Sequence, residues 1–202
     1  MEIRNNPQGS EAWHADRLGI VTMSRLKALL VNGKSASGLG ADAYTYMNQL
    51  IGERITGEPD DSFQGGRHTE RGHEMEPLAR QLYTDTTGNG IDEVGIILNH
   101  GVGFSPDGLI GDDGALEIKT KLPKFQVEVL LAGEIPKEHI AQLQGGLWVS
   151  EREWIDFVSY WPGMPLFVKR AYRDEAMIQK IAERVEIFYA ELEARMNTVM
   201  AA

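Results

Sequence analysis

The hydrophobic pattern changes its period along the chain, and each period predicts a different kind of element. In segment 70–86 apolar residues recur at helical spacing, at Met75, Leu78, Ala79 and Leu82, so this face of a helix is predicted to be buried. Short segments with strand-like composition and tight turn residues follow this helix. The order of elements predicts an α/β (α+β) fold, in which a central mixed sheet is flanked by helices.

The other elements are predicted from spacing, cap residues and turn residues in the same way. Helices are expected at 26–30, 41–52, 125–131, 137–149 and 174–197, strands at 95–98, 103–110, 115–119, 154–160 and 166–169, and loops at 31–40 and 58–66. The sequence Asp112-Asp113-Gly114 is typical of a hairpin turn, which would set the strands before and after it side by side.

Length and composition indicate an ordinary globular chain. Its 202 residues, 42% hydrophobic and 25% charged, suit one domain, 1–202, with a sizeable core. No apolar stretch is long enough to span a membrane, and the first ten residues do not resemble a secretory signal. The chain has no cysteine, which excludes disulfides and thiolate metal sites. We therefore expect a cytoplasmic protein with no membrane partner.

The net charge of −10 narrows the candidate functions. Non-specific binding to nucleic acid comes mainly from lysine and arginine on phosphates, so the charge argues against a generic basic DNA-binding protein. An acidic chain can still bind DNA if its basic groups share one surface. Candidate basic contacts are Lys34, Arg67, Arg71, Lys121 and Lys124.

The strongest chemical signal is the spacing of Asp107, Glu117 and Lys119. Side chains alternate between the two faces of a strand, so Glu117 and Lys119 point the same way and Ile118 points the other. A hairpin folded at the intervening turn brings Asp107 alongside Glu117. Two carboxylates are thus predicted to converge on one spot, with a lysine at its edge.

Such a site suits metal-dependent hydrolysis of a phosphodiester. Mg²⁺ prefers oxygen ligands, here the carboxylates of Asp107 and Glu117 and the main-chain carbonyl of Ile118, and we expect Mn²⁺ to be able to substitute. The metal activates water and neutralises the phosphate, while Lys119 orients the water or stabilises charge. For an arbitrary Glu-x-Lys the alternative, a turn aspartate and a solvated strand face, is the commoner arrangement.

Over residues 11–160 the chain resembles the lambda-exonuclease group, the YqaJ-type viral recombinase nucleases of the PD-(D/E)xK superfamily. Four blocks in the right order carry the resemblance: 12–24 (AWHADRLGIVTMS), 71–80 (RGHEMEPLAR), 105–119 (SPDG to LEIK) and 139–149 (HIAQLQGGLWV). Each block alone is weakly specific, but the four together are highly specific. The resemblance implies a restriction-endonuclease-like core.

The resemblance also implies two further residues of the catalytic centre. A helical glutamate completes the metal site in this family, and Glu76 is the match, at the border of the predicted buried face. A glutamine of the last block lies at the catalytic centre, which favours Gln144, with Gln142 as the weaker candidate. From the residues alone, both glutamines would be polar positions at a helix edge.

The first block has another role in the family, where an arginine and two serines bind the 5′-phosphate of DNA. The matching residues are Arg17, Ser24 and Ser105. An arginine fork and hydroxyl donors suit phosphate oxygens. Without the resemblance, Arg17 would be a surface ion pair and Ser24 a helix cap, and Trp13 is expected in the core rather than in the site.

The resemblance implies a processive 5′→3′ exonuclease that acts on double-stranded DNA with a 5′-phosphate end and releases 5′-mononucleotides. It also implies a homotrimer ring around the duplex, a single-strand-annealing protein as partner in recombination, and a phage or prophage gene in a bacterial host. Two alternatives stay open: an endonuclease or nickase of the same superfamily, and a catalytically idle DNA-binding module.

Overall fold

The computed structural model describes residues 1–60 and 67–202, with the backbone only for 67–70 and His73, so residues 61–66 of the expected loop 58–66 and the side chain of Arg67 lie outside the described residues. The strands form two four-stranded mixed sheets. The first has the order β1 (Glu2–Arg4), β3 (Ile96–Asn99), β4 (Val102–Phe104) and β2 (Val21–Thr22). The second has the order β5 (Gly108–Ile110), β6 (Gly114–Lys119), β7 (Trp154–Ser159) and β8 (Phe167–Tyr172).

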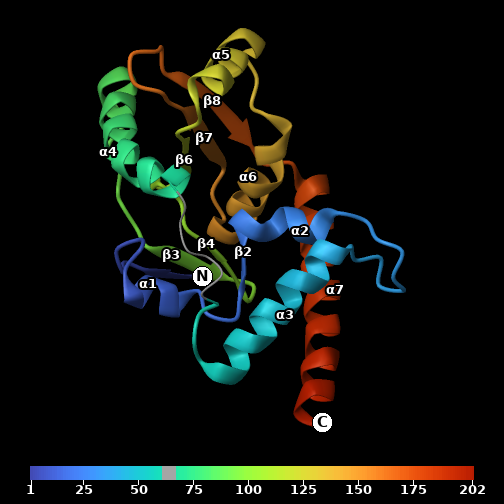
Figure 1. Cartoon of the computed structure of the whole chain (residues 1–202). Coiled ribbons are helices and arrows are strands. Elements are labelled where there is room, and N and C mark those ends of the chain that lie inside the picture. The colour runs from blue at the N-terminus through green and yellow to red at the C-terminus, as the bar shows by residue number, and fades with distance from the viewer. Residues whose placement is uncertain (61–66) are drawn as a thin grey trace.

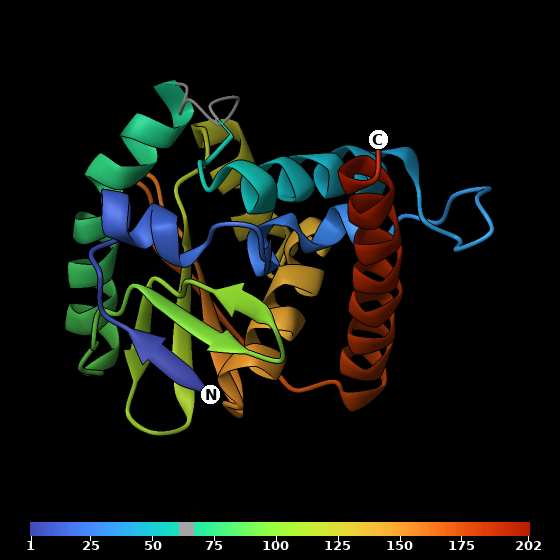
Figure 2. The same cartoon turned by 90° about the horizontal axis from the view of Figure 1, so that it is seen from below.

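Helices flank both sheets, as the α/β prediction requires (Figures 1 and 2). They are α1 (Glu11–Asp16), α2 (Leu26–Leu30), α3 (Ala41–Thr56), α4 (Arg67–Thr87), α5 (Pro123–Ala132), α6 (Lys137–Ser150) and α7 (Glu175–Met200), with a short 3-10 helix, η1 (Met23–Arg25), before α2. None of the helices in the described part of the chain is both long and apolar enough to cross a membrane.

The predicted α/β fold with mixed strands flanked by helices is confirmed, but the strands form two sheets rather than one, and the reason lies in segment 103–110. This segment was expected to be one strand, but it divides into β4 of the first sheet and β5 of the second. Ser105, Pro106 and Asp107 link the two strands. Pro106 has no N–H to donate to a sheet ladder, so pairing stops there and the chain passes to the other sheet. Asp107 therefore lies where the two sheets meet.

Helix α6 packs against both sheets and joins them into one core. Two glycines make this close approach possible. A Cβ on Gly145 would lie 2.5 Å from Sδ of Met23, and one on Gly146 would lie 2.7 Å from the ring of Phe104. A glycine inside a helix lowers the stability of the helix by about 1 kcal/mol relative to alanine. The two glycines are therefore favoured here only because they allow this close packing.

Helix α4 covers the other face of the second sheet, but with a narrower stripe than the sequence predicts. Ala79 and Tyr83 are fully buried against β6 and β7, whereas Leu78 is 58% exposed and Leu82 is also exposed. The expected burial of Leu78 and Leu82 is therefore wrong. The helix packs against a small sheet along a row of residues four apart, and these two leucines fall outside that row.

Candidate active site

The hairpin of β5 and β6 places Asp107 beside Glu117, as the spacing predicts. Gly108 pairs with Leu116 in the antiparallel register, so Asp107 and Glu117 are the next opposed pair. The backbone N–H of Asp107 donates to the Leu116 carbonyl at 3.0 Å. Oδ2 of Asp107 accepts the backbone N–H of Ile118 at 2.5 Å. The first bond pairs the two backbones, and the second holds the Asp107 carboxylate against the C-terminal end of β6.

Glu117 is the most deeply buried group of the site, with 3% of its side chain exposed. Its Oε1 atom accepts hydrogen bonds from Nζ of Lys119 at 2.5 Å and from Nε2 of Gln142 at 2.6 Å. Its other oxygen, Oε2, is buried and has no hydrogen-bond partner among the described residues. A buried carboxylate oxygen without a donor is costly, which indicates that a cation or water is its natural partner.

The main-chain carbonyl of Ile118 points toward the same spot. In an extended strand the N–H and C=O of one residue face the same edge, and the N–H of Ile118 faces Asp107. Strand β5 begins only at Gly108, so no strand partner from β5 lies opposite Ile118. The predicted ligand set of Asp107, Glu117 and the Ile118 carbonyl is therefore brought together.

Glu76 approaches the site from α4, but an arginine holds it. Arg80, one turn later, contacts Oε1 of Glu76 through Nη2 at 2.5 Å and donates from Nε to the Asp107 carbonyl at 3.0 Å. The three residues share the wall of a pocket of about 350 Å³. Sequence reasoning missed Arg80, although its spacing of four residues from Glu76 was a readable signal.

Charge is unevenly balanced at this site. Burial raises the pKa of the Asp107 carboxyl well above its usual value, and the charges of Glu117 and Glu76 raise it further. Burial alone would lower the pKa of Lys119, but the nearby Glu117 and Asp107 carboxylates outweigh it, and the net pKa is raised. Three carboxylates thus face one ammonium and one guanidinium, an excess of negative charge that a divalent cation would relieve.

The donor set fits magnesium better than zinc. Among the residues whose side chains the structure describes, no three His, Cys, Asp or Glu groups form a ready metal site. Mg²⁺ commonly uses one or two carboxylates and keeps several waters, so Asp107, Glu117 and the Ile118 carbonyl suffice. As a ligand, Glu76 would first have to exchange its contact with Arg80.

The choice of Gln144 over Gln142 is corrected by the structure. Gln142 reaches Glu117, as described above, whereas Gln144 faces the opposite way. Nε2 of Gln144 donates to the Tyr172 carbonyl and its Oε1 accepts the N–H of Asp174, both at 2.8 Å. Positions two apart on a helix lie on different faces, so only one of the two can point at the carboxylates.

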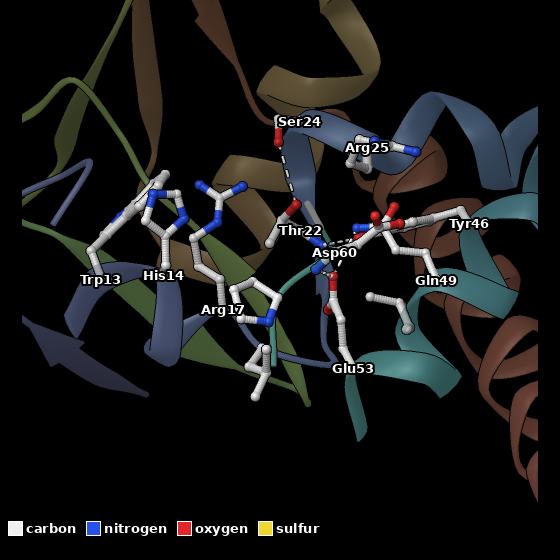
Figure 3. A pocket seen from close by; sticks show the side chains of 13 residues that line it. Trp13, His14, Arg17, Thr22, Ser24, Arg25, Tyr46, Gln49, Glu53 and Asp60 are labelled. Atoms are coloured by element: carbon white, nitrogen blue, oxygen red, sulfur yellow. Dashed lines mark hydrogen bonds between the residues drawn. The ribbon is translucent and has the colours of Figure 1, made fainter. Parts of the chain in front are cut away.

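A second pocket, of about 280 Å³, contains Arg17 and Ser24 (Figure 3). The guanidinium of Arg17 lies over the Trp13 ring at 4.0 Å from its centroid. The Ser24 hydroxyl lies 3.3 Å from that of Thr22. Burial lowers the pKa of Arg17, yet not enough to discharge a guanidinium. Among the described residues, Arg17 forms no ion pair, and Ser24 does not cap a helix.

Ser105 lies beside this pocket rather than in its wall. The indole N–H of Trp13 donates to Oγ of Ser105 at 3.1 Å and to the Gly95 carbonyl at 3.0 Å. Ser105 is therefore joined to Arg17 through the Trp13 ring. The expectation that Trp13 belongs to the core is wrong: it is half-buried, lines the pocket and supports Arg17.

Three of the candidate basic contacts lie near the C-terminal end of β6, the strand that carries Glu117 and Lys119. Lys121 and Lys124 follow β6 and both lie over the ring of Phe125. Arg71 lies over the ring of Trp161, and its neighbour Gly72 approaches Thr120. Lys34, by contrast, is exposed in the loop 31–40.

Comparison with solved structures identifies the fold. An alkaline exonuclease (LHK-Exo) from Laribacter hongkongensis matches with a TM-score of 0.84 and 37% identity over 95% of this chain and 97% of that one. Its complex with dAMP gives 0.84 and 38% over 94% and 96%. A phage-related exonuclease from Haemophilus somnus 129PT gives 0.65 and 20% over 88% and 96%, which shows a shared fold. The chain thus has the fold of an alkaline exonuclease.

A family model agrees with this assignment. The model of the YqaJ-like viral recombinase domain matches residues 12–153, which include Asp107, Glu117 and Glu76 and the whole lining of the pocket that contains Arg17. The chain belongs to the family of YqaJ-like viral recombinase domains, and this membership indicates a nuclease of recombination. A search of curated protein sequences found no match.

Proposed function

We propose that this protein is a Mg²⁺-dependent exonuclease that digests double-stranded DNA in the 5′→3′ direction, releases 5′-mononucleotides and leaves a 3′ single strand for recombination. The observation that carries the proposal is the buried Glu117 carboxylate, with one oxygen unpartnered among the described residues, between Asp107 and Lys119. The family and the alkaline exonuclease fold support a nuclease at this site.

Asp107, Glu117 and the Ile118 carbonyl would hold the metal. Mg²⁺, when bound, supplies Lewis acidity, which neutralises phosphate charge and activates water. The protein's own part is to hold the oxygens rigidly: Ile118 N–H fixes Asp107, and Gln142 and Lys119 fix Glu117. A rigid arrangement costs no reorganisation during the reaction. Glu76 would assist from α4, released from Arg80.

Lys119 acts as an electrostatic group and as a donor. Its raised pKa keeps it an ammonium at alkaline pH, so it donates hydrogen bonds and does not abstract a proton from water. It can therefore orient the attacking water and stabilise the charge that develops on the phosphate. Its contact with Glu117 keeps it close to the metal ligands.

The second pocket gives the reaction its direction. Arg17 and Ser24, with Ser105 behind Trp13, would bind the 5′-phosphate of the DNA. An arginine guanidinium presents several N–H groups in one plane, which match phosphate oxygens. With the 5′ end bound there, the phosphodiester that is cut always lies at the same distance from this end. Digestion therefore proceeds from the 5′ end. Processivity would come from a homotrimer ring around the duplex, and a single-strand-annealing protein would take the exposed 3′ strand.

Digestion of end-labelled linear duplex with and without Mg²⁺ tests the proposal. We expect release of 5′-mononucleotides from the 5′ end, and only with the metal present. Lys119→Ala should lose cleavage yet still bind DNA, while Lys169→Ala on the same sheet, whose contacts are Gly133 and Glu134, should cut normally. Normal cleavage by Lys119→Ala, or preference for a closed circle over a linear duplex, would contradict the proposal.

A further inference from the structure

Arg17 and Arg25 differ from the other arginines of this chain. Among arginines whose side chains the structure describes, these two alone have neither a hydrogen bond nor an ion pair, and both line the pocket of Figure 3. Carboxylates are abundant in a chain with a net charge of −10. Glu53 favours the charged form of Arg17 from a distance, but it forms no ion pair with it. Two guanidinia whose N–H groups are unused in one pocket therefore indicate a site for an anion.

Each of the two guanidinia lies on an aromatic ring. Arg17 lies over Trp13, and Arg25 lies 4.6 Å from the centroid of the Tyr46 ring. The Tyr46 hydroxyl is fixed because it accepts the backbone N–H of Thr22 at 3.1 Å. Stacking occupies the faces of a guanidinium and leaves the N–H groups at its edge available. Both arginines are thus held in place without use of the atoms that would bind phosphate.

Hydroxyl groups lie between the two arginines. In the view of Figure 3, Thr22 and Ser24 separate Arg17 from Arg25, and their hydroxyl oxygens are 3.3 Å apart. The acidic residues Glu53 and Asp60 also line the pocket. The two oxygens of Glu53 accept the N–H of Gly19 and Nε2 of Gln49, and the backbone N–H of Asp60 also points to Glu53.

We infer that Arg25 is a second phosphate-binding arginine, and that together with Arg17 it makes the pocket specific for a terminal phosphomonoester. This inference rests on the proposed function, in which Arg17 is the only arginine assigned to the 5′-phosphate, beside Ser24 and Ser105. A terminal phosphate carries a charge of about −1.5 to −2 at neutral pH, whereas an internal phosphodiester carries one negative charge. The first also presents three terminal oxygens, and the second only two. The N–H groups of two guanidinia can serve all three, so Arg25 discriminates a chain end from an internal position.

The experiment compares two linear duplexes of one sequence, with a 5′-phosphate or a 5′-hydroxyl end. We expect Arg25→Gln to lower kcat/KM on the phosphorylated duplex by on the order of ten- to a hundredfold, mainly through KM, and to leave the hydroxyl duplex unchanged. Lys27→Gln is the matched control, because this exposed lysine on α2 lies outside the pocket. It should keep the wild-type ratio between the two substrates.

The outcomes separate this inference from the proposed function. A wild-type protein that ignores the 5′ group overturns both. If the wild type discriminates and Arg17→Gln abolishes discrimination, but Arg25→Gln keeps it or slows both duplexes equally, only the role of Arg25 is overturned. The same holds if Lys27→Gln loses as much as Arg25→Gln, since the effect would then be general charge.

A second substitution at the same position controls for the possibility that Arg25→Gln simply fails to fold. Arg25→Lys keeps the positive charge near Tyr46 but removes the planar set of donors. We expect a melting temperature close to that of the wild type and a preference for 5′-phosphate between those of the wild type and Arg25→Gln. A full wild-type preference in Arg25→Lys, with Arg25→Gln also undiminished, would exclude Arg25 from phosphate recognition.

Discussion

Gln142 and Gln144 lie two positions apart in α6, and their contacts predict opposite consequences when each is changed to leucine. Gln142 donates to Glu117 Oε1 at 2.6 Å, whereas Gln144 joins the Tyr172 carbonyl to the Asp174 N–H. Leucine has a helix propensity close to that of glutamine and removes the polar atoms, with a side chain one atom shorter. Gln142→Leu should therefore affect catalysis, and Gln144→Leu should affect stability.

The catalytic effect of Gln142→Leu follows from the charge of its partner. A hydrogen bond to an ionised group contributes about 1.5–3 kcal/mol. If the orientation of Glu117 matters in the transition state, its loss lowers kcat by about 10- to 100-fold. Glu117 keeps its contact with Lys119, but the lost bond also stabilises the folded protein, so Tm should fall as well and the rate must be measured below the transition.

The stability effect of Gln144→Leu follows from burial and from two lost hydrogen bonds. Gln144 is 5% exposed, and its bonds tie the end of β8 to the start of α7. Tyr172 and Asp174 are themselves exposed, so water can replace part of what is lost. A destabilisation of about 1–2 kcal/mol is expected. For a chain of this size it lowers Tm by about 2–8 °C.

Two measurements on the same preparations of each variant separate a loss of catalysis from a loss of stability. The initial rate of mononucleotide release is measured with excess Mg²⁺ at a temperature well below both transitions, and Tm is measured by calorimetry. The reasoning is refuted if Gln144→Leu loses activity while its Tm is unchanged, or if Gln142→Leu cuts at the wild-type rate.

Two further predictions concern stability. Asp156→Ala should lower Tm by about 4–12 °C, because buried Asp156 accepts hydrogen bonds from Tyr83 and Arg170 and its loss costs about 2–3 kcal/mol; a drop under 2 °C in calorimetry would contradict this. Burial, and then the charge of Lys121, lower the pKa of His139 to about 4, so only the unfolded state takes up its proton below about pH 6.5. The free energy of unfolding in urea should fall by about 1 kcal/mol between pH 7.5 and 5.5, and an equal fall in His139→Asn would rule out this cause.

Several features of the site could be predicted from the sequence because they depend on local geometry. Strand alternation and a tight turn are short-range properties, so Asp107 and Glu117 could be placed side by side and Lys119 beside them. The resemblance added Arg17 and Ser24, which do share a pocket. Strand 115–119 was predicted to within one residue of β6 for the same reason.

Other features depended on contacts between distant segments, and only the tertiary structure decided them. The sequence shows two glutamines on one helix, but which of them meets Glu117 depends on how α6 is rotated against both sheets. Likewise, Leu78 is apolar and correctly spaced, yet the narrow contact of α4 leaves it exposed. Periodicity fixes which residues share a face, whereas the partner that covers this face is set by packing across the whole chain.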